Sequence, residues 1–203
     1  MRKLKLQVQI TVDGYVGGPS GDLDWRTWNW DDKLKAFAYP LRDACDTILL
    51  GRKMAEAFVP HFEETVNKLK ADNGDKALDE QFAYAYKMVN MPKIVFSKTI
   101  KTLQGKNVSV ENGDLVTAIK NLKSREGKDM IVYGGAEFVS HLVKEGLIDE
   151  FNFFVNPIMI NKGLRIFDLL DHRQKLTPVS ATAYACGISV LVFRLDRETS
   201  GAV

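Results

Sequence analysis

The sequence predicts an α/β fold of three layers, in which helices cover both faces of a mostly parallel sheet and an antiparallel hairpin follows near the C-terminal end. Three observations favour this fold. Short apolar runs that end on glycine or serine recur along the chain, amphipathic helical segments separate them, and two β-type segments flank Cys186-Gly187. Strands that alternate with helices build parallel sheets, because each crossover returns the chain to the edge where the next strand starts. No repeat or linker interrupts the 203 residues, so we expect one domain over residues 1–203.

The chain opens with a strand and a glycine-rich loop. Apolar side chains alternate with polar ones from Leu4 to Val12, which places the apolar set on one face of a strand. Residues 13–22 hold four glycines and a proline, a composition that excludes regular structure and favours a shaped loop able to close over a ligand. From Asp31 to Cys45 apolar residues recur at three- and four-residue spacing, which predicts a helix that Pro40 would kink.

The middle of the chain repeats one unit, a short buried strand followed by a turn and a helix. Residues 47–50 form the first such strand, and a helix is expected to begin at residues 52–57. Residues 60–90 mix acidic, basic and aromatic side chains without one clean period, and we expect one or two surface helices there. The remaining predicted elements are strands at 93–96 and 130–133, helices at 115–124 and 136–145, a long β-type run at 151–160, and a hairpin of 179–185 with 188–195.

The charge and the cysteine content exclude several classes of protein. A total of 28 Lys and Arg against 26 Asp and Glu leaves a net charge of +2, which gives no electrostatic reason to expect a nucleic acid or a membrane as partner. Cys45 and Cys186 form no CxxC or Cys/His set, so neither a disulfide scaffold nor a metal site is indicated. The first residues are unlike a signal peptide, and no segment approaches the ~20 apolar residues of a membrane span. We therefore expect a cytoplasmic protein without a metal.

Two strand ends carry residues suited to a phosphate. Gly51-Arg52-Lys53-Met54 lies where a buried strand turns into a helix, and the N–H groups and dipole of a helix start attract anions. Gly134-Gly135 before Ala136-Glu137 repeats this arrangement, and residues without Cβ let the backbone approach a ligand closely. Each also has a plain alternative, a glycine turn with a solvated basic pair or a tight packing turn. The GxGxxG fingerprint of the Rossmann fold is missing.

A third strand end, Ser97-Lys98, supplies a hydroxyl and an ammonium group that suit a phosphomonoester such as the 2′-phosphate of NADPH. Taken alone, it is a generic strand end. In open α/β sheets, however, ligands gather at the carboxyl ends of strands, and here three such ends carry groups suited to an anion. Together they favour a phosphorylated cofactor.

Six stretches of the chain, taken in order, resemble one known family. They are Gln9 to Val16, Gly21 to Trp25, Leu49 to Met54, Ile94 to Lys98, Tyr133 to Ala136, and Glu145 to Glu150 running on to Asn156-Pro157-Ile158 and Gly163 to Phe167. This order resembles the dihydrofolate-reductase-like domain that forms the reductase part of bacterial bifunctional riboflavin deaminase-reductases and that also occurs as small stand-alone proteins. The resemblance spans nearly the whole chain.

The resemblance implies NADPH along the strand ends and a reduced nitrogen heterocycle as product. The cofactor residues that it implies are Gly51, Arg52, Lys53 and Met54 at the phosphates, Ser97 and Lys98 at the 2′-phosphate, and Gly134, Gly135, Ala136 and Glu137 at the pyrophosphate, with Gly21 and Asp22 of the loop beside them. The Gly-Gly peptide bond is commonly cis in relatives, and a cis bond would itself indicate function here.

Two departures from the family pattern affect the expected function. Met54 stands where the pattern usually has Thr, so one phosphate hydrogen bond is expected to be lost and the preference for NADPH over NADH is left open. The HxE and PCxxC motifs are missing, so the zinc deaminase half of the bifunctional enzymes is absent.

The substrate is expected at the loop after the first strand. Asp13, Tyr15, Asp24 and Trp25 follow that strand, and an acid beside aromatic rings could bind the edge of a heterocycle while the rings stack on its face. The catalytic residue stays unknown. Asp31 or Asp32 stands where folate reductases place an acid, but a helix cap or a solvated acid explains these residues better. Asp13 has a similar rival, because Asp-Gly is common in turns.

Three functions remain open at this point. The first is an NADPH-dependent reductase of a nitrogen heterocycle such as a ribosylaminouracil or a folate. The second is a non-catalytic NADPH-binding or sensing protein of the same fold, and the third is a structural α/β domain whose glycines serve packing. A homodimer is expected from the family, and the apolar run 151–160 serves either as its interface or as a buried central strand.

Overall fold

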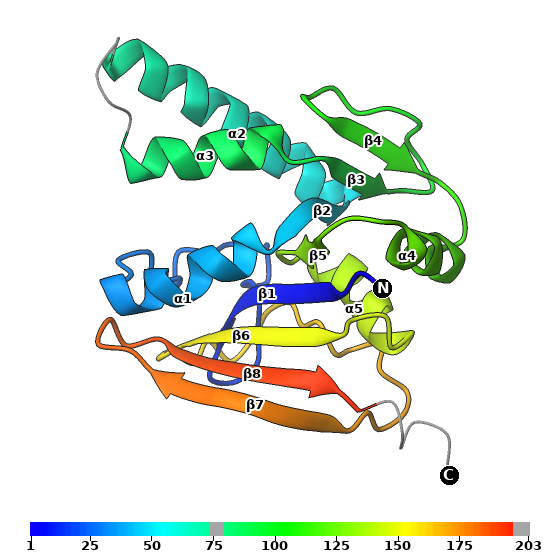
Figure 1. Cartoon of the computed structure of the whole chain (residues 1–203). Helices are drawn as coiled ribbons and strands as arrows, with labels where there is room; N and C mark the ends of the chain where they lie inside the picture. Colours follow the sequence, from blue (N-terminus) through cyan, green and yellow to red (C-terminus); the bar gives the residue numbers. More distant parts are fainter. Residues whose placement is uncertain (74–78, 197–203) are drawn as a thin grey trace.

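The computed structural model describes residues 1–73 and 79–196. Within this part of the chain, strands and helices largely alternate, except that α3 follows α2, β4 follows β3, and the last three elements are strands (Figure 1). The elements are β1 (Leu4–Thr11), α1 (Asp32–Asp43), β2 (Cys45–Gly51), α2 (Arg52–Asn73), α3 (Glu80–Asn90), β3 (Lys93–Phe96), β4 (Val108–Glu111), α4 (Leu115–Ser124), β5 (Asp129–Val132), α5 (Ala136–Lys144), β6 (Glu150–Asn156), β7 (Leu176–Ala183) and β8 (Ser189–Leu195).

The strands form one eight-stranded sheet in the order β4-β3-β2-β5-β1-β6-β8-β7. Every pair from β4 to β6 is parallel, whereas β8 runs antiparallel to both β6 and β7. The predicted fold class, a mostly parallel sheet with an antiparallel C-terminal hairpin, is therefore confirmed. Because β5 inserts between β1 and β2, the carboxyl ends of β3, β2, β5 and β1 lie next to one another along one edge.

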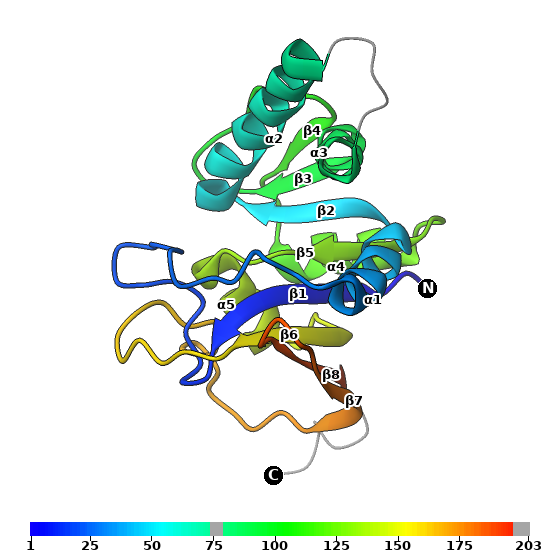
Figure 2. The ribbon, with the colours of Figure 1, turned by 90° about the vertical axis from the view of Figure 1, so that its left-hand side faces the viewer.

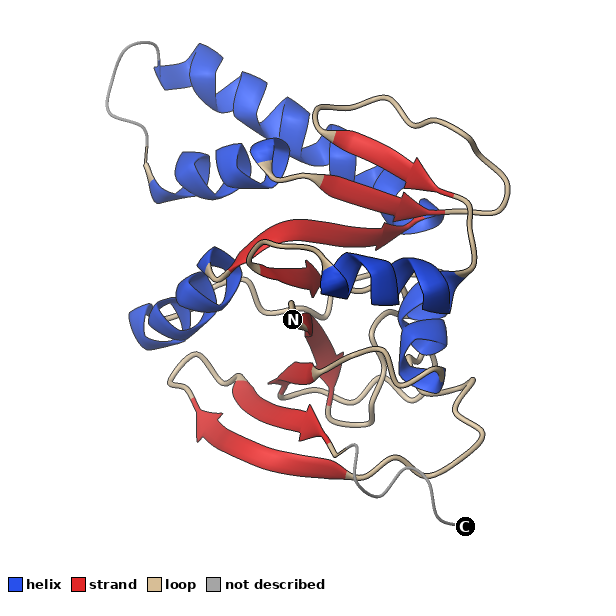
Figure 3. Ribbon diagram, turned by 45° about the vertical axis from the view of Figure 1, so that its right-hand side comes forward, coloured by secondary structure: helices blue, strands red, loops and turns tan. Residues whose placement is uncertain are grey.

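Helices cover both faces of this sheet (Figure 3). On one face, the apolar side chains of α4 and α5 pack against those of β1, β5 and β6, in a cluster that includes Leu6, Val132 and Leu142. On the other face, α2 and α3 pack over β2 and β3, while α1 packs over β6 and β8 through Leu34 and Phe154. The space on this second face between α1 and α3 lies over β1 and β5.

Helix starts differ in how they are capped. Asp31, Asp79 and Asp114 each accept a hydrogen bond from a backbone N–H in the first turn of α1, α3 and α4. This is the usual way to satisfy the free N–H groups of a helix start. In contrast, α5 begins after Gly135 without a side-chain cap, and α2 begins directly where β2 ends. The start of α5 therefore keeps N–H groups for another partner.

Several predicted boundaries were wrong. Residues 60–90 hold most of α2 and all of α3; residues 74–78 of this segment lie outside the described part. Pro60 lies inside α2, which continues past it. The run predicted as β to residue 160 ends at Asn156, because Pro157 has no N–H for the ladder. Strand β4 was not predicted, since its only apolar residues are Val108 and Val110.

A lysine is buried at the start of β3. Lys93 is 2% exposed, and its ammonium group donates to the carbonyl oxygens of Met88, Val89 and Met91 at the end of α3, at 2.8 to 3.0 Å. These contacts satisfy carbonyls that the helix end leaves free and join α3 to the sheet. Burial lowers the pKa of this ammonium group to about 8.

None of the helices in the described residues is long and apolar enough to cross a membrane. Over the same residues, no group of three or more His, Cys, Asp or Glu side chains could hold a metal ion. Both cysteines are free thiols; Cys45 is buried and Cys186 is partly exposed.

Candidate functional site

The sequence-predicted phosphate motifs meet at one edge of the sheet. Figure 2 turns this edge to the left, where β2 and β1 end and where α2 and α5 begin. Gly51 closes β2, Gly134 and Gly135 follow β5, and Ser97 follows β3. Strands β3, β2 and β5 are consecutive in the sheet, so their ends are neighbours spaced by roughly 5 Å. The three motifs therefore lie together, as ligand sites of open α/β sheets do.

Phe138, in the first turn of α5, lies where these motifs meet. A Cβ atom on Gly51 would come within 2.6 Å of the Phe138 Cβ, so the glycine is required for α5 to pack this closely against β2. The Phe138 ring stacks on Phe96 at 5.2 Å between ring centroids, and Phe96 pairs with Gly51 across β2 and β3. Packing therefore explains Gly51 by itself, and the same packing sets α5 beside the start of α2.

The starts of α2 and α5 also meet through their side chains. The Lys53 ammonium lies 3.3 Å from the Glu137 carboxylate, with both side chains largely exposed. A Cβ atom on Gly135 would lie 3.4 Å from the Met54 Cβ. Arg52 points along its own helix, where its guanidinium contacts Glu56 at 2.9 and 3.1 Å. Two cations thus stand at the edge, and each is held by a carboxylate that an incoming phosphate would compete with.

Gly134 and Gly135 have backbone conformations that other residues rarely adopt, with φ of +138° and +88°. A Cβ atom on Gly134 would meet only Val8, at 4.0 Å, so its glycine is needed for conformation more than for space. The peptide bond between them is trans, so the cis bond that is common in relatives is not present here. Their conformation turns the chain from β5 into the uncapped start of α5.

Ser97 and Lys98 tie the end of β3 to the segment after β4. The Ser97 hydroxyl accepts hydrogen bonds from the backbone N–H groups of Thr99 and Ile100. The Lys98 ammonium donates to the carbonyl oxygens of Asn112 and Gly113, at 2.9 and 2.6 Å. Lys98 is exposed and Ser97 is partly exposed, and a phosphate would share these contacts or replace them.

Asp13 and Tyr15 contact the segment that follows β6. The Asp13 carboxylate accepts from the backbone N–H groups of Ile160 and Asn161. A hydrogen bond from the Thr11 side chain and these two backbone bonds lower its pKa. The Tyr15 hydroxyl donates to the carbonyl of Asn161 and accepts from Arg165 at 2.7 Å. These contacts hold the two loops together at the ends of β1 and β6.

The rest of the glycine loop turns on itself. Gly21 has φ of +84°, and the backbone groups of Gly18 and Asp22 are hydrogen bonded at 2.9 Å. Asp22 and Asp24 are exposed. The Trp25 ring is partly buried, and its indole N–H is buried without a hydrogen-bond partner.

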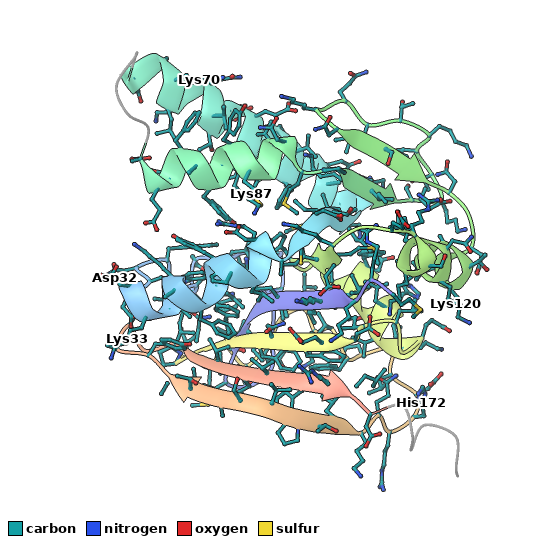
Figure 4. All side chains as sticks on the ribbon, viewed as in Figure 1. Asp32, Lys33, Lys70, Lys87, Lys120 and His172 are labelled. Atoms are coloured by element: carbon teal, nitrogen blue, oxygen red, sulfur yellow. The ribbon has the colours of Figure 1, made fainter. Side chains whose placement is uncertain are left out.

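The acid candidates on the first helix are not free. Asp31 is the N-cap of α1, as expected: its two carboxylate oxygens accept from the backbone N–H groups of Leu34 and Cys186. These two bonds lower its pKa. The side chain of Asp32 is fully exposed and points away from the sheet (Figure 4). Asp31 is thus engaged by backbone donors, and Asp32 lies in solvent.

A cavity of about 340 Å³ lies between α1 and α3, over the sheet face. Its lining includes five aromatic side chains, Trp28, Trp30, Tyr39, Tyr84 and Tyr133. Sequence reasoning missed this cavity. Tyr133 directly precedes Gly134, so the cavity begins one residue from the phosphate motifs.

The sheet face beside the cavity is more polar than a core face usually is, and Gln7 on this face lines the cavity. Gln7 and Gln9 on β1 and Asn152 and Asn156 on β6 occupy this face of the sheet, and all but Gln7 are more than nine-tenths buried. Asn156 donates to Gln9 and accepts from the backbone N–H of Thr27. The signal was present in the sequence: alternating glutamines oppose the apolar set of the first strand.

The fold and the shared strand-end edge define an α/β protein of the dihydrofolate-reductase-like class. The chain belongs to the RibD C-terminal domain family, which matches residues 2–190. This confirms the family predicted from the six stretches.

Relatives and solved structures agree with this assignment. The chain is 26% identical to the uncharacterized protein YyaP of Bacillus subtilis over 95% of its length and 94% of that protein's length. A protein assigned to riboflavin biosynthesis from Shewanella sp. PV-4 is 21% identical, with a TM-score of 0.65 over 97% of this chain and all of that one.

Two further structures carry reductase names. A diaminohydroxyphosphoribosylaminopyrimidine deaminase/5-amino-6-(5-phosphoribosylamino)uracil reductase from Thermotoga maritima has a TM-score of 0.63 at 18% identity, over 96% of this chain and 57% of that one. Dihydrofolate reductase from Enterococcus faecalis, in complex with NADP(H), has a TM-score of 0.58 at 14% identity, over 96% of both chains. At these identities, the likeness establishes the fold.

Proposed function

We propose that this protein is an NADPH-dependent reductase of a nitrogen heterocycle. One observation carries the proposal: the start of α5 has no capping side chain, and it lies beside the start of α2 and next to a cavity lined by aromatic rings. Helix starts of this kind bind phosphate groups, and the cavity offers a place for a flat ring. The family and its reductase-named structures support the same function.

The proposed cofactor residues keep their predicted roles. Gly51 to Met54 and Gly134 to Glu137 would hold the phosphates through backbone N–H groups, with Lys53 adding charge. Ser97 and Lys98 would bind the 2′-phosphate, since they follow the end of β3, the strand beside β2. Gly21 and Asp22 belong to a loop that leaves the same edge and would cover the cofactor (Figure 2).

The cofactor would supply a hydride, and the chain's own residues would align and shield the reacting ring. The aromatic side chains of α1 and α3 would hold a flat substrate against the floor formed by β1 and β5. We place the substrate ring in this cavity, whereas Asp13 and Tyr15 would act on it only by shaping the loop that closes the site. Asp24 and Trp25 stay proposed substrate contacts on that loop.

A second function is favoured by one specific observation. Among the described residues, Glu80 alone contributes a carboxylate to the lining of the cavity, and Lys35 engages it at 3.2 Å. Proton delivery to the substrate is general acid catalysis, which needs an acid within reach. A non-catalytic NADPH-binding or sensing protein therefore remains the alternative.

Two measurements test these proposals in order. Fluorescence titration with NADPH and with NADH measures cofactor binding, and NADPH oxidation against a panel of pterins, folates and aminouracils measures turnover. We expect NADPH to bind more tightly than NADH and at least one compound of the panel to be reduced. Binding without any turnover would favour the sensor, and no binding of either nucleotide at about millimolar concentration would reject both functions and leave a structural domain.

We further propose that the chain forms one cytoplasmic domain and assembles as a homodimer. The run 151–160 splits in two: β6 is paired on both sides within the sheet, whereas Ile158 and Met159 beyond it are 38% and 73% exposed. Any interface in this run would therefore involve residues after the strand. A molar mass near twice 22.8 kDa in solution would support the dimer, and a single 22.8 kDa species would reject it.

A further inference from the structure

The cavity between α1 and α3 holds two polar atoms that no other group satisfies. The Gln7 side-chain oxygen and the Tyr133 hydroxyl are both buried and have no hydrogen-bond partner. Both residues line the cavity. Leaving a buried polar atom without a partner costs free energy, so such atoms in a cavity indicate a missing ligand group.

These two atoms belong to neighbouring positions of the sheet. Leu6 pairs with Val132 across β1 and β5, and Gln7 and Tyr133 are the next residues on the two parallel strands. They therefore lie side by side, roughly 5 Å apart at the backbone, and face the same side. Burial raises the pKa of the Tyr133 hydroxyl well above its usual value, which keeps it a neutral donor. The cavity therefore holds one unsatisfied acceptor and one unsatisfied donor, which come from neighbouring strand positions.

The cations at the cavity are already neutralised. Lys35 lies 3.2 Å from Glu80 and 4.0 Å from Asp32. The Arg42 guanidinium lies 3.1 Å from Asp43 and is held between the rings of Tyr39 and Tyr84, at 4.7 and 5.3 Å from their centroids.

A third cation, at the rim of the cavity, is also paired with a carboxylate. Lys87, on the side of α3 toward α1, pairs with Asp43 (Figure 4). Lys35, Arg42 and Lys87 are therefore matched by Asp32, Asp43 and Glu80. A phosphate entering this space would have to displace a carboxylate rather than meet a free cation.

We propose that the cavity binds a planar heterocycle through a lactam edge, with its ring N–H donated to Gln7 and its ring carbonyl accepting from Tyr133, and that it disfavours a phosphate on the substrate. This inference rests on the proposed function and names its substrate class. A lactam places an N–H and a C=O on adjacent ring atoms, which matches an acceptor beside a donor. It also separates this chain from the Thermotoga reductase, which is named for a phosphoribosylamino substrate.

The first experiment uses matched pairs of ligands with the full chain, and calorimetry measures their binding. Lumazine and 1,3-dimethyllumazine share one ring system, but only lumazine keeps its ring N–H groups. We expect lumazine to bind about tenfold more tightly or better. A second pair, 5-amino-6-ribitylaminouracil and its 5′-phosphate, should favour the compound without phosphate. Equal binding of lumazine and 1,3-dimethyllumazine overturns the lactam contact. Tighter binding of the 5′-phosphate than of 5-amino-6-ribitylaminouracil overturns the claim that the cavity disfavours a phosphate.

Variants then assign the contacts. Tyr133→Phe removes the hydroxyl and Gln7→Met removes the side-chain amide, both with little change of side-chain shape, so lumazine binding should weaken about fivefold or more. Because neither atom has a partner in the free protein, the thermal midpoints should stay equal or rise. A purely structural role predicts the reverse, lower midpoints with unchanged binding, and would overturn the assignment.

Glu80→Gln tests whether the ion pairs exclude a phosphate, because the variant should gain affinity for the phosphorylated compound. It frees Lys35 from its nearest carboxylate, so the 5′-phosphate compound should bind several-fold more tightly while lumazine is unaffected; an unchanged phosphate affinity would overturn the ion-pair argument. Lys33→Ala, at an exposed position of α1, is the control (Figure 4). NADPH binding is measured in parallel. If the unaltered protein does not bind NADPH, the proposed function is rejected, whereas the results for the two ligand pairs still test the binding site in the cavity.

Discussion

Met54 offers a sharp test of the cofactor site, because a single hydroxyl group can be added there. The residue lies in the first turn of α2, and its Cβ would be 3.4 Å from a Cβ on Gly135 at the start of α5. A phosphate held between these helix starts would be within reach of a short side chain at this position. Met54→Thr supplies a hydroxyl, whereas Met54→Val supplies a methyl group in the same shape.

The pair isolates the hydroxyl, because both variants lose the same contacts of the partly buried methionine with the core. A hydrogen bond to a charged group contributes about 1.5 to 3 kcal/mol. NADPH should therefore bind to Met54→Thr roughly tenfold to a hundredfold more tightly than to Met54→Val. Fluorescence titration measures the ratio, and urea denaturation checks that the two variants are equally stable. Equal affinities in two folded variants would refute a phosphate at the start of α2.

Other positions give further predictions. Lys53→Gln should weaken NADPH binding about threefold at low salt and make this binding less dependent on salt, because the exposed cation would act on the phosphate through water at about 6 Å. Titration at several salt concentrations measures the affinity and its salt dependence. An unchanged salt dependence would place Lys53 outside the site. Gly51→Ala should lower the free energy of unfolding by about 1 to 3 kcal/mol, because its Cβ would overlap Phe138; full stability in urea would contradict the packing at this edge. Lys93→Met should be destabilised by about 2 kcal/mol or more, because three carbonyls at the end of α3 lose their donor. The folded pKa of Lys93, about 8, lies below its ordinary value of 10.5. The unfolded chain therefore binds more protons between these values, and the lysine makes the unaltered protein gain stability as pH rises through this window, by up to about 3 kcal/mol. Urea denaturation from pH 7 to 10.5 should show this gain relative to Lys93→Met, and parallel profiles would contradict it.

The sequence was most informative where one physical requirement acts alone. The alternation from Leu4 predicts β1, because a strand with one apolar face needs a period of two. Both ends of α4 were also predicted correctly. The strand-end motifs were brought together as expected, since parallel strands share one carboxyl edge. Asp31 as a helix cap followed from the chemistry of helix starts.

The parts that depend on tertiary contacts could not be predicted. Residues 60–90 show no clean period, whereas the structure has α2 running through Pro60, with Phe58 and Val66 buried on either side of it. The cavity is formed by α1, α3, β1 and β5, whose residues are separated along the chain, so no local pattern shows it. Asp13 looked like a binding acid, whereas the structure gives its carboxylate to backbone N–H groups of a segment about 150 residues away.

The central claim is that the edge formed by Gly51, Ser97 and Gly134 binds NADPH. Its most direct test is a paired titration of the purified chain with NADPH and NADH, which differ only in the 2′-phosphate. The proposed contact with Ser97 and Lys98 predicts saturable binding of both nucleotides, with NADPH about tenfold tighter or more and the difference lost in Lys98→Gln. Equal affinities, or no binding of either nucleotide, would contradict it.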